Sequence, residues 1–409
     1  MQYRRFGKTE LSMPVFSCGG MRYQQTWDDA PLDVVEAENQ RNLEATIVRA
    51  LELGITHIET ARGYGTSERQ LGQILPALRE QRPSRGGPDG LIVQTKVAPL
   101  RDADEFRRQV LDSLDRLKME RVDLLGLHGI NTHELLWWAI RPGGCLEVAR
   151  QLQAEGRVGH VGFSTHGATD LIVDAINAEP FGGFDYVNLH WYYINQWNGP
   201  AVEAATRRDL GVFIISPSDK GGMLYRPSER LVELCQPLHP IVFNCLFCLN
   251  RPEIHTLSLG ASQPSDFDLQ VSSLAHLHEA HAVIGPIVER LHAALVEAVG
   301  AEHADRFREG LPAWDAEKNA GYINTHVVLW LRQLALAYDM IEYGQMRYNL
   351  LGNGGHWFPG LSAAHLDTIT EERFAKAYGA SPFADQIVGW LRETHELLGG
   401  AEIKRLSAS

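Results

Sequence analysis

The first two thirds of the chain alternate between short β-branched apolar runs and longer stretches whose apolar residues have helical spacing. In one such cycle Leu43, Ile47 and Leu51 recur every fourth residue, which places them on one face of a helix over residues 42–53. Gly54 follows, where a helix end favours a residue in the left-handed conformation. A short strand pattern begins at residue 56, and comparable cycles follow it. This alternation predicts repeated βα units on a parallel sheet.

The alternating region holds eight strand candidates, most of them preceded by a helical stretch. They cover residues 15–18, 56–60, 91–95, 122–127, 158–163, 184–189, 212–216 and 255–259. Eight parallel strands with helices between them over about 260 residues are typical of a (β/α)8 TIM barrel, whereas an open doubly wound sheet usually has fewer strands. The predicted fold class is therefore α/β, with a TIM barrel as the main domain.

Beyond residue 260 the sequence changes character. β-branched runs almost vanish, and helical spacing recurs over residues 271–300, 325–343 and 383–398. We therefore expect a barrel over residues 1–270 and an all-helical C-terminal region over residues 271–409.

The composition narrows the class of protein. A hydrophobic fraction of 44% and a charged fraction of 22% in 409 residues exclude a collagen-like or wholly disordered chain. The net charge of -13 would repel a phosphate backbone, so we expect no nucleic-acid partner. Five cysteines are too few, and odd in number, for a disulfide framework, which favours a reducing, cytoplasmic compartment. No secretory signal and no membrane span is visible, so we expect no membrane association.

Four ionisable residues lie at or just after the ends of consecutive predicted strands. Glu59 ends the second strand, Tyr64 lies in the loop after it, Lys96 follows the third strand and His128 follows the fourth. Neighbouring barrel strands end at one rim, so these side chains are expected to converge. A nearby ammonium lowers the pKa of a tyrosine, and a carboxylate can hold that ammonium in place. With an imidazole to orient a carbonyl oxygen, the set could protonate an alkoxide as hydride reaches carbon.

Several stretches of the barrel together carry a resemblance to a known family. They are YRRFGKT at residues 3–9, GITHIETARGYGTSERQLG at 54–72, QTK at 94–96, the run 114–128 with RVDLL, and GHVGFS at 159–164. In this combination and order the chain resembles the aldo-keto reductase superfamily over nearly the whole barrel. The resemblance implies an NAD(P)H-dependent oxidoreductase that transfers hydride between a nicotinamide cofactor and an aldehyde, ketone or alcohol.

The same resemblance assigns roles to the four strand-end residues. It makes Tyr64 the proton donor, Lys96 the residue that tunes it, and His128 the group that orients the carbonyl. Glu59 stands where the family normally has aspartate, and its added methylene moves the carboxylate by about 1.5 Å. Because a misplacement of about 1 Å in an active site can cost on the order of a hundredfold in rate, either the local backbone compensates or turnover is weak. Glu59→Asp is expected to leave activity intact or to raise it.

The resemblance also implies a set of cofactor contacts. Asn188 stands where the family has a glutamine for the nicotinamide carboxamide. Ser164 matches the serine of the family's Ser-Asn pair, with Thr165 in place of the asparagine. The loop that would cross the pyrophosphate supplies Ser216, Pro217, Lys220, Gly222 and Leu224, and the adenosine-phosphate segment supplies Gly260, Ser262, Gln263, Asp266 and Gln270. Gly260 and Asp266 stand where strong NADPH binders carry lysine and arginine, which leaves the choice between NADP(H) and NAD(H) open.

Three further residues are candidates for the wall of the substrate pocket. They are His166, His190 and Trp191, which lie just past predicted strand ends. At such positions a side chain can either line the pocket or pack in the core. The substrate is expected to be a small carbonyl compound or alcohol, while its identity and the oligomeric state cannot be predicted.

The helical tail contains the sequence MRYNLLGNGGHWFPG at residues 346–360, which resembles the longer, ferredoxin-type members of the superfamily. No cysteine follows Cys248, so we expect no iron–sulfur cluster there. Cys245 and Cys248 form a CxxC pair among apolar residues and are expected to be buried helix thiols, with no metal bound.

Two alternative functions remain open from the sequence. The first is a nucleotide-binding barrel of low activity that serves as a redox sensor or scaffold, because of the Glu59 change and the large tail. The second is a metal-dependent hydrolase built on His128, His166 and His190.

Overall fold

The computed structural model describes residues 1–83, 86–218, 220–352 and 359–400, and the chain divides into two compact units. The first unit comprises Met1–Gly222 and Ile241–Ala280, and the second comprises Met223–Pro240 and His281–Ser409. The helical unit therefore takes in Met223–Pro240, a segment that the sequence places inside the barrel. A domain boundary at residue 270 stays a prediction.

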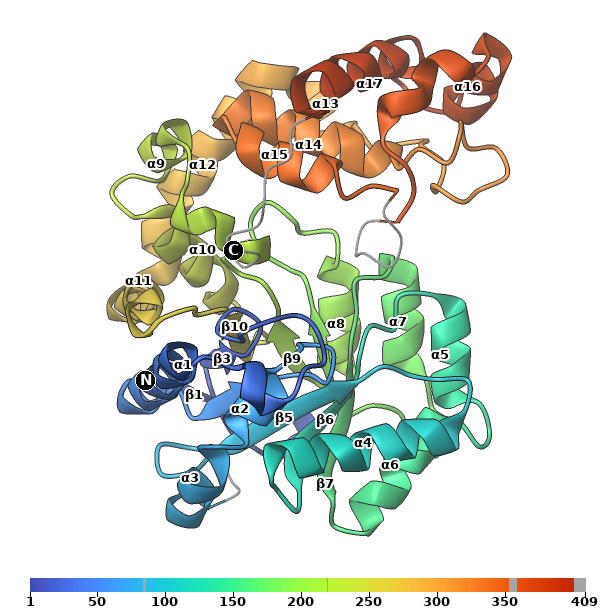
Figure 1. Ribbon diagram of the computed structural model, residues 1–409. Helices are drawn as coiled ribbons and strands as arrows, with labels where there is room; N and C mark the ends of the chain where they lie inside the picture. The colour runs from blue at the N-terminus through green and yellow to red at the C-terminus, as the bar shows by residue number, and fades with distance from the viewer. Residues whose placement is uncertain (84–85, 219, 353–358, 401–409) are drawn as a thin grey trace. The chain divides into compact units, whose positions relative to one another are not determined.

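The first unit is a closed barrel of eight parallel strands in the order β10-β3-β4-β5-β6-β7-β8-β9, which confirms the predicted (β/α)8 fold (Figure 1). The strands are β3 (Phe16–Gly19), β4 (His57–Glu59), β5 (Ile92–Val97), β6 (Val122–Leu127), β7 (Val158–Ser164), β8 (Tyr186–Leu189), β9 (Gly211–Ile214) and β10 (Thr256–Leu259). Each overlaps one of the eight predicted strands. Closure leaves no barrel strand with an unpaired edge, because β10 pairs with both β9 and β3.

Helices follow most strands and lie around the outside of the barrel (Figure 1). They are α1 (Ala37–Glu52), α2 (Ser67–Leu71), α3 (Leu75–Gln81), α4 (Ala103–Leu117), α5 (His133–Ile140), α6 (Cys145–Ala154), α7 (Thr169–Asn177), α8 (Gly199–Arg207), α10 (Pro240–Leu249) and α11 (Asp268–Ser272). Helix α1 buries Leu43 and Ile47, as the spacing predicts. Gly54 follows with φ +80°, the left-handed conformation expected there. Cys245 and Cys248 are buried in α10, where burial raises the pKa of both thiols.

An antiparallel hairpin, β1 (Tyr3–Arg5) with β2 (Ser12–Pro14), precedes the barrel. Phe6 and Met13 from this hairpin pack with residues that begin barrel strands, among them Ile92 and Tyr186. At the first residue of β9 only glycine fits, because a Cβ on Gly211 would lie 2.6 Å from the Phe6 ring. The hairpin thus closes the amino-terminal end of the barrel, and the carboxyl end is the one available for chemistry.

The second unit is helical. Its helices are α9 (Glu229–Cys235), α12 (Ala280–Val299), α13 (Ala301–Arg306), α14 (Thr325–Tyr338), α15 (Ile341–Tyr348), α16 (Glu371–Tyr378) and α17 (Ala384–Leu398), of which α14, α15 and α17 pack on one another (Figure 1). The helix predicted over 325–343 is two helices, because Asp339 adopts φ +54° and ends α14. Arg332 interrupts the apolar run of α14 and forms an ion pair of 2.7 Å with Glu393 of α17.

Residues 353–358, the centre of the ferredoxin-type motif at 346–360, lie outside the described residues. Within the described part of the chain, no single helix combines the length and apolarity needed to cross a bilayer, although the bent pair Glu229–Cys235 and Pro240–Leu249 meets that criterion on length and composition alone.

Candidate active site

A buried ion pair lies at the carboxyl end of the barrel. Glu59 is the last residue of β4, and Lys96 lies in β5, one residue before the strand ends. Lys96 Nζ donates hydrogen bonds to Glu59 Oε1 and, at 2.8 Å, to the carbonyl oxygen of Thr60. The Lys96 and Glu59 side chains are only 2% and 4% exposed. Two charges so far from water persist only when they are paired and hydrogen-bonded, so the pair fixes both side chains at this point of the barrel.

Tyr64 and His128 lie beside this pair. The Lys96 ammonium lies 4.8 Å from the centroid of the Tyr64 ring. The His128 ring meets the Tyr64 ring edge-on, with 5.6 Å between centroids and an angle of 85°. The backbone N–H of His128 donates to Val97 at 2.8 Å, which places the histidine directly at the end of β6 and next to β5. The structure therefore brings all four predicted strand-end residues together.

The pKa of Tyr64 shifts in the opposite direction to the one expected from the sequence. Burial raises it well above its ordinary value, and the charge of Glu59 raises it further. Burial lowers the pKa of Lys96, although the adjacent Glu59 carboxylate opposes that change. The expectation considered the ammonium alone, whereas in the structure the carboxylate neutralises it. Tyr64 is therefore protonated at neutral pH and can act as an acid.

Trp27, in the long loop after β3, forms a wall beside Tyr64. Its indole meets the Tyr64 ring edge-on at 6.3 Å between centroids and is 44% exposed. The loop is tightly positioned here, because the carbonyl oxygen of Thr26 accepts a hydrogen bond from the backbone N–H of Thr66 at 3.2 Å. Gly65 permits this approach, since its φ is +51° and a Cβ there would lie 1.9 Å from the Thr26 oxygen.

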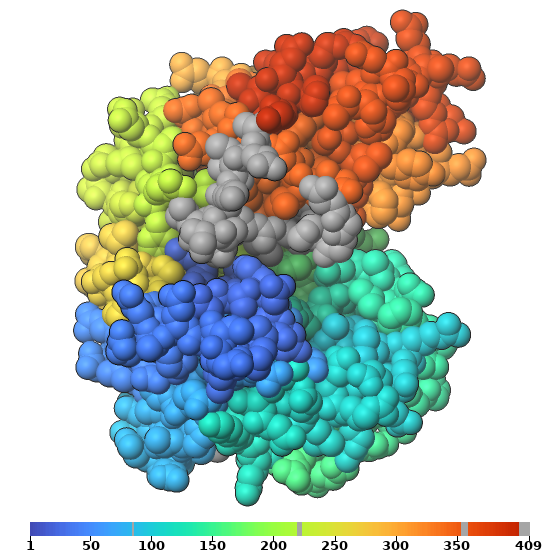
Figure 2. All heavy atoms as spheres, in the orientation of Figure 1, coloured from blue at the N-terminus to red at the C-terminus, as the bar shows by residue number. Residues whose placement is uncertain are grey.

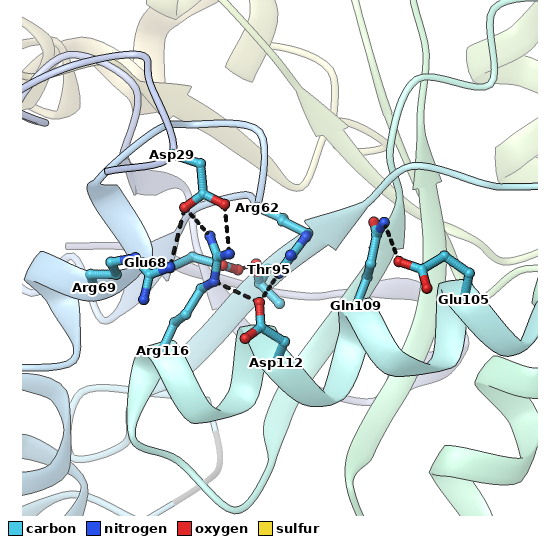
Figure 3. Close-up of polar contacts among 9 residues, drawn as sticks. All are labelled: Asp29, Arg62, Glu68, Arg69, Thr95, Glu105, Gln109, Asp112 and Arg116. Carbon is cyan, nitrogen blue, oxygen red and sulfur yellow. Dashed lines mark hydrogen bonds and ion pairs between the residues drawn. The ribbon is translucent and has the colours of Figure 1, made fainter. Parts of the chain in front are cut away.

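A network of arginines and aspartates connects the same loop to the helices outside the barrel. Figure 2 shows the amino-terminal region, in blue, lying against the cyan segments that follow it, and Figure 3 shows the bonds involved. Arg116 of α4 donates two hydrogen bonds of 2.8 and 2.7 Å to Asp29 and a third of 2.7 Å to Asp112. Arg69 lies 3.3 Å from Asp29, and Arg62 pairs with Asp112. The network thus connects the segment that carries Trp27 to the segment that carries Tyr64.

Asn188 and Ser164 lie opposite each other in the register of β7 and β8. The Ser164 hydroxyl accepts a hydrogen bond of 3.1 Å from the backbone N–H of Gly129. Asn188 is fully buried, and neither its amide nitrogen nor its amide oxygen has a hydrogen-bond partner among the described residues. A buried amide without partners is costly and rare in native proteins. Its position at the carboxyl end of the barrel fits a ligand carrying a carboxamide.

The predicted adenosine-phosphate segment is organised around Asp266. The backbone N–H and the hydroxyl of Ser262 each donate to Asp266 Oδ2 at 2.8 Å. Arg22, from the loop after β3, donates to the Gly260 carbonyl at 2.5 Å and lies 3.4 Å from the same Asp266 oxygen. A Cβ on Gly260 would lie 3.2 Å from Arg22 Cδ, so the glycine leaves room for the arginine. Gln263 precedes the short 3-10 helix Pro264–Phe267.

The predicted pyrophosphate loop is described in part. Ser216 adopts φ +57°, and the carbonyl oxygen of Pro217 accepts a hydrogen bond of 2.7 Å from Asn244. Gln270 donates to the Ser218 hydroxyl at 3.4 Å, which connects this loop to the adenosine-phosphate segment.

Three of the predicted loop residues are not placed with these. Lys220 and Gly222 belong to the 3-10 helix Lys220–Tyr225, and the side chain of Lys220 lies outside the described part of the structure. Leu224 belongs to the second unit, where it lines a cavity of about 370 Å³. Contact of these three residues with a cofactor stays a prediction.

Comparison with known proteins decides the family. The sequence model of the aldo/keto reductase family matches residues 16–216. The barrel belongs to the aldo/keto reductase family. The chain is 28% identical over 287 residues to L-galactose dehydrogenase of Arabidopsis thaliana, which covers 59% of this chain and 84% of that protein. Membership of this family places the chain in the class of NAD(P)-dependent oxidoreductases.

Solved aldo-keto reductases share the barrel fold. The holo form of an aldo-keto reductase from Bacillus halodurans has 18% identity and a TM-score of 0.56 over 71% of this chain and 96% of that chain. An aldo-keto reductase from Klebsiella pneumoniae, solved in complex with NADPH, has 16% identity and a TM-score of 0.52 over 70% of this chain and 95% of that chain. At these identities the likeness shows the fold alone.

The predicted pocket residues of this aldo-keto reductase barrel pack in two different ways. His166 Nδ1 lies 2.8 Å from His190 Nε2, and the rings stack with 4.9 Å between centroids. Trp191 is buried, stacks on Phe247 at 5.1 Å and has the Arg251 guanidinium 5.0 Å from its ring. Trp191 therefore packs in the core, and a pocket role for the two histidines stays a prediction. Among the residues that the structure describes, no group of three or more His, Cys, Asp or Glu side chains is placed to hold a metal ion.

Trp27 and Arg22 were not predicted from the sequence. Both come from the loop after β3, which has no periodic pattern and no strand end to mark it. A tryptophan and an arginine in a polar loop are the only signals there, and each is too common to single out. Their contacts with Tyr64 and Asp266 emerge only from the fold.

Proposed function

We propose that this aldo-keto reductase reduces an aldehyde or ketone, or oxidises the corresponding alcohol, with Tyr64 as the proton donor in the direction of reduction. The observation that carries the proposal is the position of the buried Lys96–Glu59 pair against the Tyr64 ring, with His128 at the ring edge. A small carbonyl compound or alcohol is the substrate class that this set of groups can serve.

Each of the four residues has one task in the proposal. When bound, the nicotinamide supplies hydride to the carbonyl carbon or accepts it from the alcohol. Tyr64 gives its phenolic proton to the carbonyl oxygen, and His128 orients that oxygen. Lys96 stabilises the phenolate that remains, because a cation near the ring favours the ionised form. Glu59 holds Lys96 in position and is a positioning residue.

The cofactor contacts in the proposal begin with Asn188. Its amide, which lacks partners within the described residues, would bind the nicotinamide carboxamide together with Ser164. Asn188 is fully buried, so this contact requires that the groups covering it move when the cofactor binds. The same amide–amide complementarity would fix which face of the nicotinamide meets the substrate.

We further propose a preference for NAD(H) over NADP(H). Asp266 places a carboxylate in the segment that would face the adenosine ribose, and Arg22 is engaged with that carboxylate and with the Gly260 carbonyl. A 2′-phosphate brings about two further negative charges, which Asp266 repels. A ribose hydroxyl can instead donate a hydrogen bond to a carboxylate.

The test is a comparison of wild type and Tyr64→Phe with both cofactors and a panel of aldehydes, ketones and alcohols. Cofactor fluorescence should give equal dissociation constants for the two proteins, whereas single-turnover oxidation of bound NADH or NADPH by substrate should be lost in Tyr64→Phe. Equal turnover in both proteins would exclude Tyr64 as the donor. Tight cofactor binding without turnover of any compound by wild type would favour the low-activity sensor or scaffold instead.

A further inference from the structure

The second carboxylate oxygen of Glu59 has its own partner in the barrel. Oε1 is engaged by Lys96, while Oε2 accepts a hydrogen bond of 3.2 Å from the hydroxyl of Ser258. Ser258 lies in β10 and Glu59 in β4, and β3 lies between them in the barrel. Both residues are buried. The glutamate is thus held from two sides, by an ammonium on the next strand and by a hydroxyl two strands away.

The contact passes over Gly19, the residue of β3 that pairs with Glu59 in the register. A Cβ on Gly19 would lie 2.7 Å from Ser258 Oγ and 3.1 Å from Glu59 Oε2. It would therefore occupy the space between the two groups. The backbone of Gly19 has no positive φ, so the absence of a side chain is what the position requires. Only a residue without a side chain lets a glutamate on β4 reach β10.

An aspartate at the same position would not reach. Its carboxylate would be withdrawn by about 1.5 Å, one carbon–carbon bond. The distance to the Ser258 hydroxyl, already 3.2 Å with glutamate, would then exceed about 3.6 Å, at which no hydrogen bond remains. The contact therefore requires both the longer side chain of Glu59 and the hydroxyl of Ser258, and the absence of a side chain on Gly19 leaves room for it.

We propose that Ser258 is a positioning residue for the reaction, acting through Glu59 to orient Lys96 beside Tyr64. The inference rests on the proposed function. It explains how a glutamate can serve where this family normally has an aspartate: the barrel anchors the displaced carboxylate from the opposite side. It also reverses the effect expected from the sequence alone, because Glu59→Asp should now lower the rate.

The experiment compares Ser258→Thr with Ser258→Val, which differ in one hydroxyl and have nearly the same shape. Both are β-branched and suit a strand, so both should fold. Ser258→Thr should keep kcat near wild type. Ser258→Val should lower kcat about tenfold, the loss expected when a hydrogen bond to a charged group is removed. The dissociation constant for NADH, followed by fluorescence, should not differ between them.

The decisive arm repeats the pair in the Glu59→Asp background. There the shorter carboxylate is out of reach, so threonine and valine at position 258 should give the same kcat, and both should resemble Glu59→Asp alone. Equal rates for Ser258→Thr and Ser258→Val in the Glu59 protein would overturn the proposal. So would a rate for Glu59→Asp at or above wild type, or independent losses from the two sites. If wild type itself turned over no carbonyl compound or alcohol, the proposed function would fail first, and the two failures are thereby distinguished.

Discussion

Asn188→Leu should make the free protein more stable and make it a poorer binder of nicotinamide cofactor. The amide of Asn188 is fully buried and lacks hydrogen-bond partners among the described residues. Leucine has the same branching and no polar atoms, so the substitution removes the cost of the desolvated amide. For an unsatisfied buried polar group that cost is about 1–3 kcal/mol, and the free energy of unfolding should rise by a similar amount.

A matched control is available in Asn244→Leu. Asn244 is also buried, but its nitrogen donates to the carbonyl oxygen of Pro217 at 2.7 Å and its oxygen accepts from the backbone N–H of Tyr193 at 3.1 Å. Leucine removes the hydrogen bonds that Asn244 makes to the Pro217 carbonyl and to the Tyr193 N–H, so Asn244→Leu should lower the free energy of unfolding by about 1–3 kcal/mol. Two asparagine-to-leucine changes in one barrel should therefore have opposite signs.

The assay is urea unfolding followed by tryptophan fluorescence, with and without NADH. An unchanged slope with a shifted midpoint would show that stability itself changed. At a cofactor concentration of about 100 times the dissociation constant, wild type should gain about 2.7 kcal/mol on binding. If Asn188→Leu weakens binding tenfold, the gain at the same concentration should fall to about 1.4 kcal/mol. Loss of stability in Asn188→Leu, or an undiminished gain from NADH, would refute the reasoning.

Three further predictions concern other parts of the site. The pKa of Tyr64 is raised, and the donor must be protonated. The value of kcat/KM for carbonyl reduction should therefore stay level through neutral pH and fall only above the ordinary tyrosine pKa of about 10. A fall centred near neutrality in a pH–rate profile would contradict this prediction. Asp266→Asn should improve NADPH binding relative to NADH by about tenfold, measured by fluorescence titration, because one repulsive charge is removed. Arg116→Met should lower the free energy of unfolding by about 2 kcal/mol, since its 5% exposed guanidinium binds Asp29 and a second aspartate. The exposed Arg108 is the control, and Arg108→Met should change stability by less than about 0.5 kcal/mol.

The fold could be predicted because it repeats. Most barrel strands are short runs rich in apolar or β-branched residues, and the helices between them carry apolar residues at helical spacing. The same pattern therefore recurs eight times along the chain. The helical break at Asp339 was not predictable, because the apolar pattern continues across it and a non-glycine residue takes φ +54°. The same applies to Met223–Pro240, whose association with the helical unit depends on packing.

The core of the candidate site could be predicted for a topological reason. Residues at the ends of consecutive strands must meet at one rim. The proximity of Glu59, Lys96 and His128 could therefore be predicted before any distance between them was known. Ser258 and Arg22 could not, since their partners lie 199 and 244 positions away and neither is marked by a motif. The sequence does not mark polar residues that support a site from distant segments, because their contacts form only when the barrel closes.

The raised pKa of Tyr64 is consistent with its task once both states of the reaction are considered. In the resting protein Glu59 neutralises Lys96, so burial decides and the phenol keeps its proton. After the proton has left, a phenolate faces the ammonium 4.8 Å from its ring. Their attraction in a site shielded from water is then far larger than before transfer. Lys96 thus stabilises the phenolate, while burial and the Glu59 charge oppose it, and the raised pKa of Tyr64 shows that the opposing effects prevail in the free protein. Tyr64 therefore keeps its proton until hydride reaches the carbonyl carbon, which makes the carbonyl oxygen basic enough to accept that proton.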